Sequence, residues 1–333
     1  MELNKNNNKP TVFSGVQPSG ILHLGNYLGA LVQWVEMQDQ YNCIFSVVDY
    51  HAITIKQNPE ELKKRIINVV KMYLASGINP EKAIIFQQSA VSAHTELAWI
   101  LNCVARIADL NKMTQFKEKA GDQEKTVSVG LYDYPILMAA DILLYNTDIV
   151  PVGDDQIQHV ELTRTLARRF NREYGQIFKV PEVIIKKQGA RIMGLDDPTK
   201  KMSKSAGSPA NYIALTDSPE VATKKIMRAV TDSDSEIKYD LKKKPAIANL
   251  MTIYSLLAGL SLKELEQNYK NKGYGDFKKG LAQAISKFLT QFQIKYNSFT
   301  DEKVKQILKH GADKIRPIAE ETLKNVKNKL GII

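Results

Sequence analysis

The chain has 333 residues, of which 44% are hydrophobic and 25% are charged, a composition typical of a globular protein large enough for two domains. The first ten residues are polar and no apolar run approaches the length of a membrane span, so we expect a cytoplasmic protein with no membrane partner. Cys43 and Cys103 are too few for a zinc site, and their apolar surroundings favour buried thiols over a disulfide.

The net charge of +10 is concentrated in the C-terminal part. Residues 1–205 hold 24 Lys and Arg against 22 Asp and Glu, whereas residues 206–333 hold 22 against 14. A basic C-terminal part favours a polyanionic partner such as RNA, although a solvated lysine-rich surface would give the same composition.

A strand, a tight turn and a helix are predicted within residues 13–31. The apolar run that starts at Phe13 breaks at residues 18–20, and apolar residues then recur at helical spacing. A helix start has unpaired backbone N–H groups that suit a phosphate. Gly20 and Gly25 allow close approach, and His23 and Asn26 add donors. An ordinary strand–helix turn remains the alternative.

Alternating strands and helices follow in the next residues. Residues 42–48 form a continuous apolar run, Asn58 and the proline after it begin a helix that ends at Gly77, and residues 82–86 form another apolar run. This alternation predicts a doubly wound parallel sheet. His51 follows the first of these two strands, where it either contacts a ligand or forms a hydrogen bond within its own loop.

One acid, Asp141, interrupts the otherwise apolar helical run of residues 134–145. Because a buried carboxylate needs a partner, Asp141 is expected to bind either an internal donor, such as an arginine or a backbone amide, or a ligand. We favour the ligand. Further along, Gly153, Asp154 and Asp155 follow a short buried strand, where the acids either bind ribose hydroxyls or stabilise the start of the next helix.

Lysines and serines are concentrated in residues 200–205, Lys-Lys-Met-Ser-Lys-Ser, after a predicted strand at residues 189–193. By itself such a run is common in loops. Beyond residue 205 only helices are predicted, with starts at Ser218 and Ser261 and a last helix that contains Ile315 and Leu330.

Residues 23–26, His-Leu-Gly-Asn, resemble the first signature of class I aminoacyl-tRNA synthetases, and residues 201–205 resemble the second. The longer run from Gln17 to Tyr27 is similar to the tryptophanyl-tRNA synthetase family. We call these segments the first and second signatures. The resemblance implies a Rossmann-like catalytic domain at residues 1–205, with a helical insertion at about 90–125, and a helical anticodon-binding domain at residues 206–333.

The resemblance also implies an ATP site. Catalytic roles fall to His23, Asn26, Lys201 and Lys204. The residues expected to bind ATP are Gln17, Pro18, Ser19, Gly25, Asn26, Gly153, Asp154, Asp155, Ile192, Lys201, Met202, Ser203, Lys204 and Ser205. Mg²⁺ is expected to arrive with ATP, and no dedicated metal site is predicted.

In this family the acid that matches Asp141 accepts the indole N–H of tryptophan, with Met138 nearby, and His51 is a further candidate. The implied activity is the joining of tryptophan to tRNA(Trp) through an adenylate, by a homodimer whose interface includes the insertion. A tyrosyl-tRNA synthetase, a small adenylyltransferase of the same superfamily and a non-catalytic RNA-binding paralogue remain alternatives.

Overall fold

The computed structural model describes residues 9–18, 20, 22–113, 128–153, 156–185, 191–204 and 207–333. The predicted site residues Ser19, Asp154, Asp155 and Ser205 lie outside the described residues, as do residues 189 and 190 of the strand expected at 189–193. The rest of that prediction is wrong, because residues 191–193 form only an isolated bridge at Met193.

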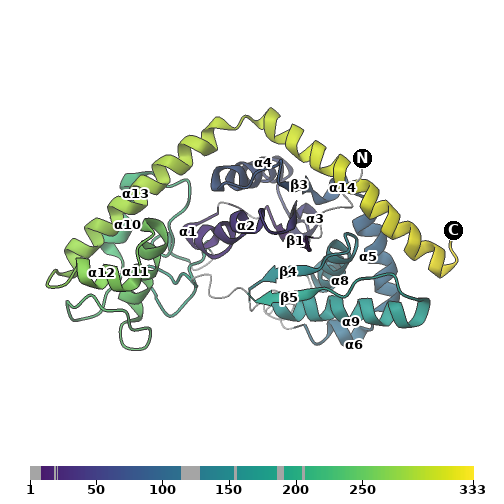
Figure 1. Ribbon diagram of the computed structural model, residues 1–333, viewed down its shortest axis with the longest axis horizontal. Coiled ribbons are helices and arrows are strands. Elements are labelled where there is room, and N and C mark those ends of the chain that lie inside the picture. The colour runs from purple at the N-terminus through teal and green to yellow at the C-terminus, as the bar shows by residue number, and fades with distance from the viewer. Residues whose placement is uncertain are drawn as a thin grey trace.

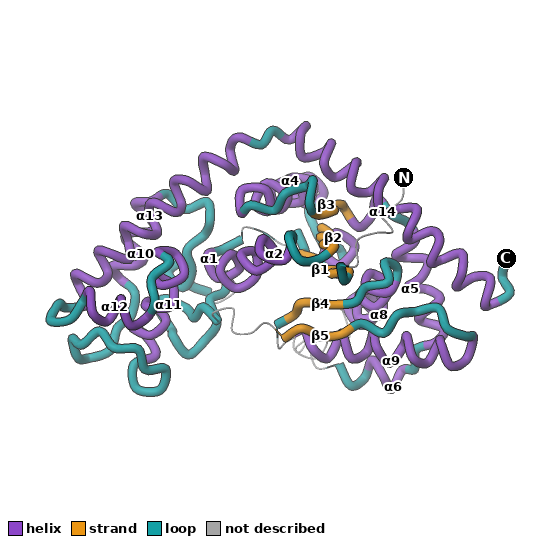
Figure 2. Tube along the Cα trace, in the orientation of Figure 1, coloured by secondary structure: helices purple, strands orange, loops and turns teal. Residues whose placement is uncertain are grey.

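A five-stranded parallel sheet with the order β3-β2-β1-β4-β5 lies at the centre of the N-terminal part (Figure 2). This order confirms the predicted doubly wound sheet, whose connections reverse direction between β1 and β4. The fifth strand was not predicted, because its apolar run is only three residues long. The strands are β1 (Thr11–Val16), β2 (Asn42–Val47), β3 (Ala83–Gln87), β4 (Ile149–Val152) and β5 (Glu182–Ile185).

Alternate residues of the strands pack into two apolar cores, one on each face of the sheet. Val12 and Phe45 join a core built with α2 (Val32–Met37) and α4 (Pro59–Ser76). Phe13 and Ile44 point the other way, into a core built with α5, α8 and α9. Both faces are therefore covered, which explains why the strands read as continuous apolar runs.

The sheet opens at the point where its connections reverse. The ladder between β1 and β4 contains a single Cα pair, Val12 with Ile149, whereas β1 and β2 pair along six residues. Pro151 lies further along β4 and has no N–H to donate to a neighbour. The carboxyl ends of β1 and β4 thus lie side by side without being joined, which leaves room for a ligand.

The remaining helices cover the sheet and form the C-terminal part. Near the first signature, α1 (Leu24–Asn26), a π-helical turn η1 (Tyr27–Leu31) and α2 follow one another without a break. The others are α3 (Asp49–Ala52), η2 (Gln88–Ala90), α5 (Ala93–Val104), α6 (Ile107–Leu110), α8 (Val129–Leu143), α9 (Ile157–Tyr174), α10 (Pro219–Arg228), α11 (Pro245–Ala258), α12 (Leu262–Asn268), α13 (Tyr274–Ser298) and α14 (Asp301–Leu330).

All regular elements described beyond residue 206 are helices, as predicted. The predicted N-caps are confirmed at Ser218 and Ser261, whose hydroxyls accept N–H groups three residues on. The helix α11 and most of α13 were not predicted from the sequence. No single described helix is long and apolar enough to cross a membrane; α11 and α12 meet that test only as a pair bent by 104°.

The last two helices form a long arch that reaches from the group α10–α12 to the sheet (Figure 1). The final helix, α14, packs on the edge strand β3 and on α4 and α5 rather than on α10–α12. Its Gly311 makes this possible, because a Cβ there would lie 1.9 Å from the carbonyl oxygen of Ile85. The helical part is therefore joined to the sheet by close backbone packing.

Gly311→Ala is expected to destabilise the fold by about 3 kcal/mol, because the methyl group must displace the backbone of the edge strand. Gly275→Ala is the matched control, since nothing lies within 4 Å of its added Cβ in α13. It should stabilise the protein by about 0.5 kcal/mol through helix propensity. Urea unfolding measures both changes, and equal stabilities would show that α14 does not pack on β3 this closely.

Candidate active site

The two signatures meet at the turn after β1. Gly20 has a backbone φ of +141°, and a Cβ there would lie 2.6 Å from the Nζ atom of Lys204. The ammonium group of the second signature thus lies directly over the turn of the first. Gln17 and Pro18 connect β1 to this turn, and Gly153 follows the neighbouring strand β4, so all three lie at the rim where the sheet opens.

His23 and Asn26 form the start of the helix. The Asn26 side-chain oxygen accepts the His23 backbone N–H at 3.0 Å. The His23 ring is 7% exposed, and among the described residues its Nδ1 atom has no hydrogen-bond partner. Burial and the nearby charge of Lys201 lower the His23 pKa from 6.5 to about 4. His23 is therefore neutral at pH 7, with an unused polar atom near the charge of Lys201.

Gly25 is needed for a reason that the sequence analysis did not foresee. Its absent side chain was expected to make room for a nucleotide. In the structure a Cβ on Gly25 would lie 3.0 Å from the His23 ring and 3.4 Å from Cβ of Met202. The glycine thus lets the two signatures pack against each other.

The second signature lies at the end of a short antiparallel turn. Met193 pairs with Lys201, and the Met202 N–H donates to the Ile192 carbonyl at 2.9 Å. The side chains of Ile192 and Met202, which we expected at ATP, are buried in the apolar core. Lys201 and Lys204 remain exposed, and Ser203 is half-buried. The loop is therefore anchored by its apolar residues and presents its cations.

Two asparagines that the sequence analysis missed hold this loop. Asn249 accepts the Met193 N–H at 2.8 Å and donates to the Met193 carbonyl at 3.0 Å. Asn211 accepts the Ser203 N–H at 2.9 Å and donates to Asp196 at 2.6 Å. Single asparagines in a helix and a loop give no pattern in the sequence, so only the fold reveals them.

The segment that follows Asn211 forms hydrogen bonds with the first signature and so connects it to the second. The Leu24 N–H donates to the Ile213 carbonyl at 2.8 Å, and the Leu215 N–H donates to the Leu22 carbonyl at 3.0 Å. Because one short segment binds both signatures, their separation is fixed by backbone hydrogen bonds.

Asp141 lies in α8, only 1% exposed, and internal donors surround it. His51 donates to its Oδ2 atom at 2.8 Å, and Gln88 and His94 donate to Oδ1 at 2.7 and 2.6 Å. Burial alone would raise the pKa of this carboxyl, but the hydrogen bond from His51 and the interactions with His94 hold it well below its usual value. Asp141 is therefore an ionised acceptor.

The internal partner of Asp141 is thus neither of the two types that the sequence suggested. Two histidines and a glutamine bind it, in place of an arginine or a backbone amide. The predicted loop histidine His51 is one of them. A carboxylate can accept about four hydrogen bonds, and the described residues supply three, which leaves one acceptor position among them. That position belongs to Oδ2, the oxygen with a single donor.

Met138, the two cysteines and Lys225 lie outside the contacts described so far. Met138 is half-buried in α8, one turn before Asp141. Cys43 is buried as expected, but Cys103 is exposed on α5, because that position faces away from the core. Lys225, in the basic C-terminal part, is paired within the fold, since it donates to Asp217 at 2.7 Å and to the Tyr212 carbonyl at 2.9 Å.

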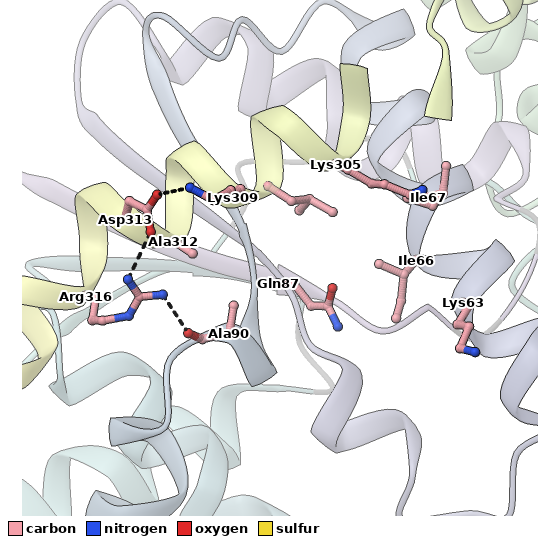
Figure 3. A pocket seen from close by; sticks show the side chains of 11 residues that line it. Lys63, Ile66, Ile67, Gln87, Ala90, Lys305, Lys309, Ala312, Asp313 and Arg316 are labelled. Carbon is pink, nitrogen blue, oxygen red and sulfur yellow. Dashed lines mark hydrogen bonds and ion pairs between the residues drawn. The ribbon is translucent and has the colours of Figure 1, made fainter. Parts of the chain in front are cut away.

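A cavity of about 510 Å³ lies apart from these residues, between α4, the end of β3 and α14 (Figure 3). Its basic residues are paired with their own acids or carbonyls. Lys309 and Arg316 bind Asp313 at 3.2 and 3.0 Å, and Arg316 also donates to the Ala90 carbonyl at 3.2 Å. None of the predicted site residues that the structure describes lines it. No metal-binding cluster of His, Cys, Asp or Glu occurs in the described part of the chain.

The model of the family "tRNA synthetases class I (W and Y)" matches residues 5–290. Beyond the family, the chain is 54% identical over 322 residues to the tryptophan–tRNA ligase of Caldanaerobacter subterraneus subsp. tengcongensis, which covers 97% of this chain and 98% of that protein.

Two crystal structures share the fold over nearly the whole chain. The tryptophanyl-tRNA synthetase of Mycoplasma pneumoniae is 37% identical with a TM-score of 0.89, covering 97% of this chain and 98% of that one. That of Campylobacter jejuni, complexed with ADP and tryptophan, is also 37% identical, with a TM-score of 0.83 and coverage of 96% and 99%.

The fold, the two joined signatures and the family match define a class I aminoacyl-tRNA synthetase. Identity near one half over almost the full length narrows this further: the chain belongs to the tryptophan–tRNA ligases. The tyrosine-specific alternative is thereby set aside.

The low pKa of His23 makes the fold sensitive to acid. The folded protein binds a proton at His23 only near pH 4, whereas the unfolded chain binds it near pH 6.5. Stability should therefore fall as the pH drops through this window, by about 3 kcal/mol from this group. The variant His23→Thr has no such group and should lose correspondingly less stability between pH 7 and pH 4. Urea unfolding across this range compares the two, and parallel curves would contradict the assignment.

Proposed function

We propose that ATP binds where the two signatures meet and that tryptophan binds beside it, next to Asp141. The observation that carries the ATP site is the position of Lys204 over Gly20, which puts a cation at the end of the β1 turn. The relative from Campylobacter jejuni was solved with ADP and tryptophan, which supports two adjoining sites.

The residues of the ATP site supply charge and donors. Lys201 and Lys204 would neutralise the triphosphate. Neutral His23 offers its unpartnered Nδ1 atom. Gly153, after β4, is proposed on the ribose side together with Asp154 and Asp155. Mg²⁺ is proposed to enter as part of the substrate MgATP.

The residues of the tryptophan site supply specificity. The remaining acceptor position of Asp141 Oδ2 would take the indole N–H, with Met138 and His51 nearby. An amino acid without that N–H would leave a buried carboxylate short of a donor, which is costly in an apolar site. The same argument separates tryptophan from tyrosine, whose hydroxyl needs different polar groups.

The reaction needs no protein nucleophile. The carboxylate of tryptophan attacks the α-phosphorus of ATP, the bond from that phosphorus to the bridging oxygen breaks, and pyrophosphate leaves. A hydroxyl of the terminal adenosine of tRNA(Trp) then attacks the carbonyl carbon of the adenylate and loses its proton. The bond from that carbon to the phosphate oxygen breaks, and AMP leaves. Lys201 and Lys204 stabilise the charge that develops on the leaving pyrophosphate, so catalysis rests on positioning and charge.

The C-terminal helices are proposed to bind the tRNA. Lys224 and Arg228 are exposed on α10 and suit contacts to the phosphate backbone, whereas Lys225 is already paired. The predicted cytoplasmic location belongs to this proposal, and membership of a translation family supports it.

A homodimer is proposed to form through the helices of the insertion. Trp99 in α5, Ile107 in α6 and Val129 at the start of α8 are 71%, 74% and 81% exposed. Their elements are neighbours, since α5 and α6 both pack on α8. Large apolar side chains gathered on one side of a protein favour an interface, and a second copy is the occupant that the family resemblance implies.

Lys204→Ala should slow tryptophan-dependent pyrophosphate exchange by about 100-fold, because the cation acts mainly on the departing phosphates. Tryptophan binding at equilibrium should change less than about threefold. Lys200→Ala is the matched control, since Lys200 pairs with Asp197 and is 76% exposed. An equal loss of exchange and of tryptophan binding in Lys204→Ala would contradict the role in catalysis. An RNA-binding paralogue without catalysis would show no exchange in the parent chain.

Ile107→Glu should convert the dimer to a monomer, because a charge at an apolar interface cannot be solvated. Ile294→Glu on α13 is the control, with a side chain that is 67% exposed but far from the insertion. Sedimentation velocity reports the mass of each variant. A parent chain that is monomeric at micromolar concentration, or dimers in both variants, would refute this interface.

A further inference from the structure

The two oxygens of Asp141 have different surroundings. Oδ1 accepts hydrogen bonds from Gln88 and His94, both of which are completely buried. Oδ2 accepts one hydrogen bond, from His51 at the rim of the sheet. The carboxylate therefore has one oxygen fixed by the interior and one turned toward the end of β2.

The donors to Oδ1 are themselves held in a single orientation. The Tyr50 backbone N–H donates to Oε1 of Gln88 at 3.1 Å, so the amide of Gln88 must turn its NH₂ group to Asp141. The Tyr145 hydroxyl lies 2.6 Å from Nε2 of His94, on the ring edge opposite the one that faces Asp141.

The tautomer of His94 follows from Tyr145. Tyr145 is 3% exposed. Among the described residues, the hydrogen-bond partner of its hydroxyl is Nε2 of His94. Burial and the charge of Asp141 raise the Tyr145 pKa well above its usual value, so the hydroxyl keeps its proton and donates it. Nε2 is then an acceptor, and the ring proton is on Nδ1, where it points at Asp141.

The packing around His94 leaves the ring little freedom. Its plane stacks on Phe86 at 5.8 Å between ring centroids, and Tyr145 stacks on Phe13 at 5.7 Å. The two rings that carry the hydrogen bonds are thus held between strand residues of β1 and β3. Stacking on these strand residues restricts the His94 and Tyr145 rings, and the hydrogen bond from His94 in turn restricts the Asp141 carboxylate.

We propose that His94 and Tyr145 are positioning residues for recognition of the amino acid. Tyr145 selects the His94 tautomer, and His94 together with Gln88 holds Oδ1 of Asp141. Oδ2 is thereby kept in place for His51 and for the indole N–H. This inference rests on the proposed function, because it takes Asp141 to be the acceptor for tryptophan.

The test compares tryptophan with an analogue in which sulfur replaces the indole N–H, β-(benzothiophen-3-yl)-L-alanine. Tyr145→Phe removes the hydroxyl and lets the other His94 tautomer form, which presents a lone pair to Asp141. The kcat/KM ratio of tryptophan to analogue in pyrophosphate exchange should fall about tenfold, mainly through the KM for tryptophan. The KM for ATP and the activity with the analogue should stay within about twofold.

Two substitutions of His94 separate positioning from packing. His94→Asn keeps a donor near the place of Nδ1 and should retain most of the ratio, whereas His94→Leu keeps the volume without a donor and should lose it. Tyr73→Phe is the matched control, because among the described residues the buried Tyr73 hydroxyl has no hydrogen-bond partner. It should leave the ratio and both KM values unchanged.

An unchanged ratio in both Tyr145→Phe and His94→Leu would overturn the proposal. Equal losses for tryptophan, analogue and ATP would overturn it too, since they indicate a general structural role. Asp141→Asn separates failure of the proposed tryptophan site from failure of the positioning role. If this variant leaves the ratio of tryptophan to analogue unchanged, the proposed tryptophan site is wrong. If it lowers the ratio while the His94 and Tyr145 variants do not, only the positioning role is wrong.

Discussion

A carboxylate in an apolar helix is the constraint on which this site depends. Removing one partner from a buried charge costs about 3–5 kcal/mol, so the donors to Asp141 must all be present in the fold. They come from the ends of β2 and β3 and from α5, while the acid itself lies in α8. The charge therefore fixes four elements relative to one another at the rim where a parallel sheet binds ligands. In the proposed function, this one interaction serves both stability and recognition.

The proposed ATP side is built in a different way, from backbone contacts and glycines. Gly20 and Gly25 leave space that Lys204, His23 and Met202 occupy, so the signatures are complementary surfaces as well as sources of charge. The segment at 213–215 binds the first signature, and α14 packs on β3 through Gly311. The C-terminal helices and the segment before them thus contact the N-terminal part beside the first signature, at the sheet edge and, through α13, on α4. Any movement of the helices must change at least one of these contacts.

The sequence predicted the elements whose local pattern is strong and missed those that depend on distant partners. Apolar runs and helix caps gave four of the five strands and the start of α10 and α12. The short strand β5 has an apolar run of only three residues. The helix α11 was missed although Pro245 at its start and Gly259 after its end are helix boundary signals. At the site, the sequence correctly required a partner for Asp141, but it could not supply Gln88 and His94, because they are brought together only by the crossover between β3 and α5. Asn211 and Asn249 were missed because the fold, and no local sequence pattern, brings them to the loop that they hold.

A crystal structure of this chain with tryptophan and a non-hydrolysable ATP analogue tests the central claim most directly. The account predicts the indole nitrogen about 3 Å from Oδ2 of Asp141, with Oδ1 still bound by Gln88 and His94, and the γ-phosphate beside Lys204. Tryptophan bound elsewhere, with Asp141 contacting only its internal donors, would contradict it.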